Sequence, residues 1–202
     1  MPKPSSSAGR GFGGNGITFA GASVMLDPQH LHGDDARREG QPRRVLLLAD
    51  TGFDAPARLL ARFGLSLERI PADDPIPGSY WGDCEAGIIG TTVYARDDTP
   101  VHSLLHEAGH LIVLPPERRL GVHTDATDSV AEEDAVCVLQ GLLGDALPGV
   151  GRTRVWADMD IWGYTFRLGS ARAYVEHDAD AAWDWLRHRG LVDAGHNLRL
   201  PA

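Results

Sequence analysis

The stretch LLHEAGHLIV, residues 104–113, holds two histidines four positions apart, with a glutamate directly after the first. It matches the pattern His-Glu-x-x-His at His106, Glu107 and His110. Four residues make little more than one turn of an α-helix, so both imidazoles lie on one face and can bind one metal ion. Apolar residues form a stripe on the other side of this helix. The stretch therefore predicts a core-packed helix that presents two histidines and a glutamate to a cleft.

A catalytic zinc site needs three protein ligands and one open position for water. The segment DSVAEEDAVCVLQGLLG, residues 128–144, predicts a second helix that begins with several acidic side chains. On a helical wheel Glu132 falls in the middle of the apolar stripe, where an ionised carboxylate is costly unless it is paired or bound to a metal. Glu133 falls on the polar side, with Gln140. We therefore expect Glu132 to be the third ligand, with Asp128 and Glu133 as the alternatives.

The composition is that of an ordinary globular protein, with 202 residues, 43% hydrophobic and 23% charged. The formal net charge of −9 disfavours direct nucleic-acid binding, because that binding relies on Lys and Arg to neutralise phosphates. No apolar run is long enough to cross a membrane, and the amino terminus lacks the apolar core of a signal peptide. We therefore expect a cytoplasmic protein in which Cys84 and Cys137 are reduced thiols.

The chain divides into a segment rich in Gly, Ser and polar residues, 1–43, and one domain, 44–202. The first segment is expected to be flexible, because it can bury little apolar surface. Its GxGxxG pattern has no strand before it and no helix after it, which argues against a dinucleotide site. In the second segment the patterns predict strands first and helices later, which favours an α+β fold with a small mixed or antiparallel sheet. Expected strands are 45–49, 65–70 and 88–95, and expected helices are 54–63, 100–113, 126–143, 154–168 and 179–189.

The order of motifs resembles a known group of enzymes. His-Glu-x-x-His on one helix and a glutamate on the next is similar to the gluzincin arrangement of thermolysin, and more closely to the small ImmA/IrrE-like metallopeptidases. The glutamate helix of that family tends to read E-x-x-A-N-x-F-A-x-x-L-L. The matching positions here are Glu132, Ala135, Leu142 and Leu143, whereas Val136, Val138 and Leu139 depart from the pattern. The resemblance covers about residues 65–145 and implies a zincin-like fold.

The resemblance implies a small zinc-dependent peptidase that cleaves a specific protein for regulation, with a protein or peptide as its partner. Zinc would be held by His106, His110 and Glu132, and Glu107 would act as the general base. A strand within residues 87–96 would pair with the extended substrate backbone, and the alternative is that it is simply a strand of the core. Candidates for stabilising the oxyanion are Tyr164, Arg167, Tyr174 and His177.

Two further histidines have less specific interpretations. We expect His102, one turn before His106, to line the cleft or to cap the helix, and not to be a fourth ligand. We expect His123 to be a solvated loop residue.

Several other protease families carry the same His-Glu-x-x-His motif, and the sequence argues against some of them. The metzincin extension requires Gly and His where this chain has Val113 and Pro116. Membrane-embedded zinc proteases require spanning helices that the sequence does not predict. An FtsH-like protease domain, with a distant Asp as third ligand, remains an alternative, although no P-loop is present. A metal-binding regulatory protein that acts by contact and hydrolyses nothing is the other alternative, and the presence of Glu107 argues against it.

Overall fold

The computed structural model describes residues 44–80, 82–127 and 129–201. The prediction of a flexible segment at residues 1–43 and the alternative ligand Asp128 therefore lie outside the described residues. In chain order the elements are α1 (Leu48–Thr51), α2 (Asp54–Arg62), β1 (Ser66–Arg69), β2 (Gly87–Ile89), β3 (Thr92–Ala95), α3 (Val101–Val113), α4 (Pro116–Arg119), α5 (Val130–Asp145), α6 (Arg152–Trp162), α7 (Ala171–His177) and α8 (Asp180–His188).

The fold is α+β, as the order of patterns predicted. The strands form one small mixed sheet in the order β1-β3-β2, in which β1 runs parallel to β3 and β2 runs antiparallel to it. The stretch expected as a single strand over 88–95 is instead a hairpin. Its turn contains Gly90 at φ 62°, a left-handed conformation that costs glycine little and other residues more. The turn lets Ile89 pair with Thr92 across the ladder.

The strand predicted at 45–49 is not formed. Within it, Leu47 makes only an isolated bridge to Pro100, and the chain then turns into the short helix α1. The Asp50 carboxylate accepts a hydrogen bond from the Leu47 backbone N–H at 3.0 Å and pairs with Arg44. A short apolar run is compatible with either structure, and here a local side-chain-to-backbone bond favours the turn.

The predicted helices at 54–63, 100–113, 126–143, 154–168 and 179–189 correspond to α2, α3, α5, α6 and α8, with shifts at their ends. The largest difference is at α6, which stops at Trp162 because Gly163 adopts a left-handed C-cap. The short helices α4 and α7 were not expected. None of the helices in the described residues is both long and apolar enough to cross a membrane.

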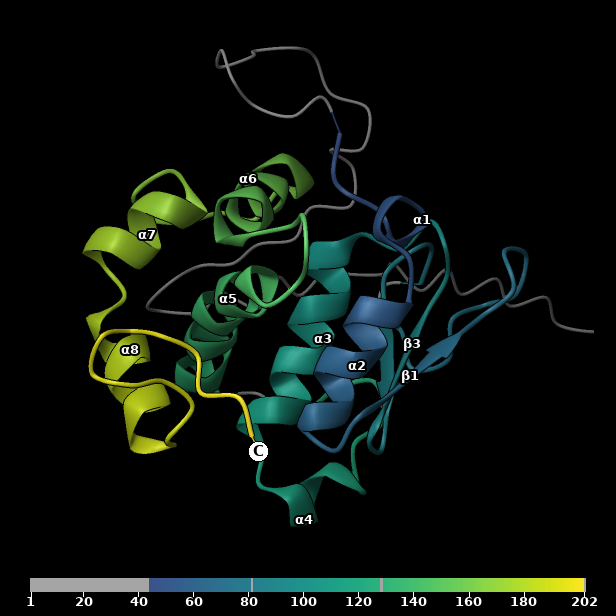
Figure 1. The fold of residues 1–202 in the computed structure, drawn as a ribbon, viewed down its shortest axis with the longest axis horizontal. Helices are drawn as coiled ribbons and strands as arrows, with labels where there is room; N and C mark the ends of the chain where they lie inside the picture. The colour runs from purple at the N-terminus through teal and green to yellow at the C-terminus, as the bar shows by residue number, and fades with distance from the viewer. Residues whose placement is uncertain (1–43, 81, 128, 202) are drawn as a thin grey trace, which may run out of the picture.

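The helices pack in layers beside the sheet (Figure 1). α3 lies between the sheet and α5, and α6 and α8 pack against α5 on its other sides. α2 packs against β1. The hydrophobic core therefore runs continuously from Leu48 to Val192, with α3 and α5 at its centre.

Burial of α3 is almost complete. Pro100 precedes its first residue and Pro115 follows shortly after its last, so the helix ends where prolines remove backbone donors. Every residue of α3 is buried except Glu107, which is half-buried. The least buried residue of this helix is thus the glutamate of the motif.

A glycine allows α3 and α5 to approach closely. A Cβ atom placed on Gly109 would lie 2.9 Å from Cγ1 of Val136, which is shorter than carbon atoms tolerate. Glycine in the middle of a helix costs about 1 kcal/mol relative to alanine. Here that cost is offset by the tight contact between the two helices that carry the motif residues.

We predict that Gly109→Val lowers the free energy of unfolding by roughly 1–3 kcal/mol, because the added methyl groups overpack this contact. Urea denaturation measures the change. Adding Val136→Ala should recover part of the loss in a double-mutant cycle. The control Gly121→Val, where a Cβ would meet only the Arg118 carbonyl oxygen at 3.8 Å, should cost less. Equal losses at both glycines would contradict the assignment of Gly109 to the helix contact.

Candidate metal centre

Three side chains converge between α3 and α5. Nε2 of His106 lies 3.1 Å from Nε2 of His110. One carboxylate oxygen of Glu133 lies 3.3 Å from His106 Nε2, and the other lies 3.4 Å from His110 Nε2. The two histidines are each 8% exposed, and the Glu133 side chain is 20% exposed. Two nitrogens and a carboxylate thus form a compact triangle of potential ligand atoms.

The size of this triangle fits a bound cation. Zinc is held tetrahedrally at about 2.0–2.1 Å from nitrogen or oxygen, which places neighbouring ligand atoms about 3.3 Å apart. The three observed separations lie between 3.1 and 3.4 Å, with a different oxygen of Glu133 facing each histidine. His106 and His110 also have the i, i+4 spacing that puts both rings on one side of α3. The residues present therefore fit a small divalent metal ion.

The carboxylate in this cluster is not the one expected from the sequence. Glu132 is buried, as its place on the wheel indicated, but the carboxylate that pairs with the two histidines is that of Glu133. Its nearest cation is Arg189, at 4.0 Å, just beyond the end of α8. The other carboxylate oxygen of Glu132 has no hydrogen-bond partner among the residues that the structure describes. The expectation of Glu132 beside the imidazoles is thus replaced by Glu133.

The reason for this difference is the position of α5 in the core. All its residues from Ala135 to Gly144 are buried, because neighbouring elements cover every side of the helix. The apolar stripe therefore does not identify the face that meets α3. That face is marked instead by Glu133, Val136 and Gln140, at spacings of three and four. The available signal was the repetition of polar side chains on one face of the helix, the face that the wheel gives as its polar side.

Gln140 holds one of the histidines. Its side-chain oxygen lies 3.0 Å from Nδ1 of His106, and Gln140 itself is completely buried. An amide oxygen accepts, so Nδ1 of His106 carries the proton and its Nε2 lone pair points to Glu133 and His110. Ligand histidines in metal sites commonly have such a partner on the other ring nitrogen. The sequence pattern places Gln140 on the polar side of the helix but does not indicate this role.

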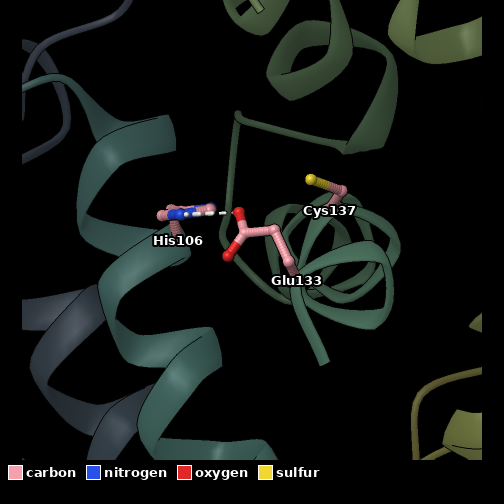
Figure 2. A group of neighbouring side chains, drawn as sticks. All are labelled: His106, Glu133 and Cys137. Atoms are coloured by element: carbon pink, nitrogen blue, oxygen red, sulfur yellow. Dashed lines mark ion pairs between the residues drawn. The ribbon is translucent and has the colours of Figure 1, made fainter. Parts of the chain in front are cut away.

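Cys137 lies one turn beyond Glu133 on the same helix. Its sulfur, a ring nitrogen of His106 and a carboxylate oxygen of Glu133 all lie within 4.8 Å of one another. Figure 2 shows the Glu133 carboxylate directed at His106, with Cys137 close by on α5. The group His106, Glu133 and Cys137 could hold a metal ion. Cys137 is 1% exposed, and burial raises the pKa of its thiol well above the usual value.

Burial also determines the charge of the motif residues. It lowers the pKa of His110 well below the usual value, with a smaller contribution from His106, so His110 is a neutral imidazole that can bind a cation. The pKa of Glu107 is raised well above its usual range, first by burial and then by the carboxylates of Glu133, Glu85 and Asp125. A carboxylate with raised proton affinity beside a metal site is suited to accept a proton from water.

Of the candidate oxyanion donors, the structure brings Tyr164 to the centre. Its ring centroid lies 5.9 Å from that of His106, and the residue is buried. Tyr174 instead stacks on Phe166 at 5.2 Å. Arg167 is paired with Asp178, and His177 is exposed.

His102 is buried next to this cluster. It is 1% exposed and lies edge-on to the rings of Trp162 and Tyr164. Burial, followed by the charge of His106, lowers the pKa of His102 to about 3, so its ring is neutral. Within the described residues neither ring nitrogen has a hydrogen-bond partner.

The strand next to the centre has a covered edge. β2 is one of the two edge strands of the sheet, but the backbone of Ile88 is bonded on its outer side. Its N–H donates to the Gly78 carbonyl at 3.2 Å, and its carbonyl accepts from the Thr124 N–H at 3.0 Å. The neighbouring residue His123 is exposed in this loop, as expected. In this structure an extended substrate therefore does not find a free row of backbone groups at Ile88.

Comparison with known proteins gives no match: no protein-family model, no curated protein and no solved structure is similar enough to indicate a family. The resemblance to the ImmA/IrrE-like metallopeptidases thus remains a prediction from the motif residues.

We predict that Gln140→Leu weakens zinc binding by about 10–100-fold, because it leaves the buried Nδ1–H of His106 without an acceptor. Competition with a chromophoric chelator measures the affinity. The control Gln140→Glu keeps an acceptor at the same position and should bind zinc more tightly than Gln140→Leu. Equal affinity of wild type and Gln140→Leu would contradict a positioning role for this side chain.

Proposed function

We propose that this protein is a zinc-dependent metallopeptidase with a zincin-like site formed by His106, His110 and Glu133. The observation that supports this most strongly is the triangle of ligand atoms with the spacing of a tetrahedral centre, next to a glutamate that takes no part in it. A purely structural metal site has no need of that glutamate. The proposal keeps the function expected from the motif and moves the third ligand by one residue.

A bound zinc would lower the pKa of its water to near 7 and polarise the carbonyl of a peptide bond. In this mechanism His106 and His110 bind through Nε2, and Gln140 holds His106 in the tautomer that leaves Nε2 free. Glu107 accepts the proton of the attacking water and passes it to the leaving amine. Its raised proton affinity supports this role.

Tyr164 is the side chain that we propose to donate a hydrogen bond to the developing oxyanion. It comes from the segment after α6, and its ring lies against that of His106. Burial raises the pKa of its phenol well above the usual value, so the hydroxyl keeps its proton and remains a donor.

The proposed substrate is a protein or an extended peptide, and not a nucleic acid. The net charge of −9 supports this choice, and so does the resemblance of the motif order to the ImmA/IrrE-like family. Cleavage of one specific protein for regulation fits that resemblance better than general digestion. The FtsH-like alternative loses support, because Glu133 already lies where a distant aspartate would be needed.

One observation favours a second candidate function. The thiol of Cys137 lies beside the same centre, and structural zinc sites commonly use cysteine and close the fourth position. A metal-binding regulatory protein that acts by contact, without hydrolysis, is therefore the second candidate. Peptide hydrolysis by the metal-loaded protein would favour the peptidase, and its absence would favour the regulatory protein.

The adjacent glutamates give a matched test of the ligand set. We predict that wild type binds about one zinc per chain, that Glu133→Gln loses most of it, and that Glu132→Gln keeps it, because a structural or catalytic centre depends on each carboxylate ligand. Mass spectrometry of protein dialysed against zinc and then against buffer measures the content. Loss of zinc in Glu132→Gln with retention in Glu133→Gln would reverse the assignment. No zinc in wild type would exclude the centre.

Glu107→Gln tests the chemistry separately from metal binding. We predict that this variant retains zinc but hydrolyses peptide bonds at least about 100-fold more slowly, because it lacks the general base. A library of internally quenched peptides, incubated with each zinc-loaded protein, reports hydrolysis. Hydrolysis by wild type and by Glu107→Gln at the same rate would exclude the mechanism, and hydrolysis by neither would favour the contact-based regulator.

A further inference from the structure

Cys137 is the buried thiol that the proposed mechanism does not use. It is 1% exposed and is a free cysteine. A side chain of this size in a helix core is often only a small apolar filler. Its position beside two proposed metal ligands gives it a second possible role.

The geometry of α5 directs Cys137 to the centre. Glu133 and Cys137 are four residues apart, so both side chains project from the same face of the helix. Gln140, three residues further on, also contacts His106 from this face. Figure 2 shows the Glu133 carboxylate directed across to His106 on α3, with the Cys137 sulfur nearby on α5. The thiol is therefore part of the polar stripe that forms the centre.

The distances allow coordination after a small adjustment. The sulfur lies within 4.8 Å of a His106 ring nitrogen and a Glu133 oxygen. In a tetrahedral zinc site, with sulfur at about 2.3 Å and nitrogen at about 2.05 Å from the metal, sulfur and nitrogen are about 3.6 Å apart. From that upper limit the sulfur would have to approach His106 and Glu133 by little more than about 1 Å, and His110 is not a member of the group that lies within 4.8 Å. Zinc and cobalt both accept thiolate ligands readily.

We propose that Cys137 is a fourth protein ligand of the metal that His106, His110 and Glu133 hold, an inference that rests on the proposed centre. On metal binding the thiol gives its proton to solvent, and the thiolate sulfur binds the metal. Four protein ligands leave no position for the water that Glu107 would deprotonate. Cys137 therefore holds the peptidase in a closed resting state, which opens when water or a substrate carbonyl replaces the sulfur.

Cobalt substitution tests this directly, because Co²⁺ in a low-symmetry site gives visible d–d bands and a coordinated thiolate adds a charge-transfer band in the near ultraviolet. The chain has only two cysteines, so Cys84→Ser retains Cys137 as its single thiol. We expect cobalt-loaded wild type and Cys84→Ser to show both kinds of band. Cys137→Ser should keep the visible bands and lose the charge-transfer band.

The outcomes separate the two proposals. Visible bands without a charge-transfer band, in both wild type and Cys84→Ser, would overturn the role of Cys137 and leave the centre of His106, His110 and Glu133 in place. Absence of cobalt bands from wild type would overturn the centre itself and the role of Cys137 with it. Because Cys84→Ser answers the question by itself, the test does not depend on whether Cys137→Ser folds.

Discussion

The contact between α3 and α5 is the constraint on which the rest of the structure depends. α3 supplies both histidines and α5 supplies the carboxylate, so the separation of the two helices sets the size of the ligand triangle. Gly109 permits this separation, because any Cβ at its position would collide with Val136. The glycine lies directly before His110, so the same turn of α3 provides both the contact and a proposed ligand. Packing and chemistry are thus decided by the same few residues.

Polar groups at this contact are costly, and the structure only partly compensates for them. Nδ1 of His106 has Gln140 as its partner, but Nδ1 of His110 and the side-chain nitrogen of Gln140 have none among the described residues. A buried polar group without a hydrogen bond costs about 1–3 kcal/mol. An apolar contact between the same two helices would be more stable. Such local departures from good packing are typical of functional sites, and this supports the proposed metal centre.

The two sides of the centre come from different parts of the chain. On the sheet side, the loop before β2 carries Glu85, and on the helical side α6 ends with Trp162. The indole N–H of Trp162 donates to the Glu85 carboxylate at 3.2 Å, so a hydrogen bond joins the loop before β2 to the end of α6. Glu85 is close enough to Glu107 to raise the pKa of Glu107. Burial raises the pKa of Glu85, so its electrostatic environment resembles that of Glu107. The surroundings of the proposed general base are therefore acidic and partly shielded from water.

The sequence by itself determined the α+β class, the positions of the main helices and the pairing of His106 with His110. These follow from local rules: apolar periodicity, prolines at helix ends, and a four-residue spacing that any α-helix converts into one face. The tertiary structure alone decided the third side chain of the cluster. The helical wheel correctly predicted that Glu132 is buried. However, α5 is buried on several sides, and the residues beside His106 are Glu133, Cys137 and Gln140. Which face of a fully buried helix meets which neighbour is set by the packing of all the surrounding elements, and a single helix's pattern does not contain it.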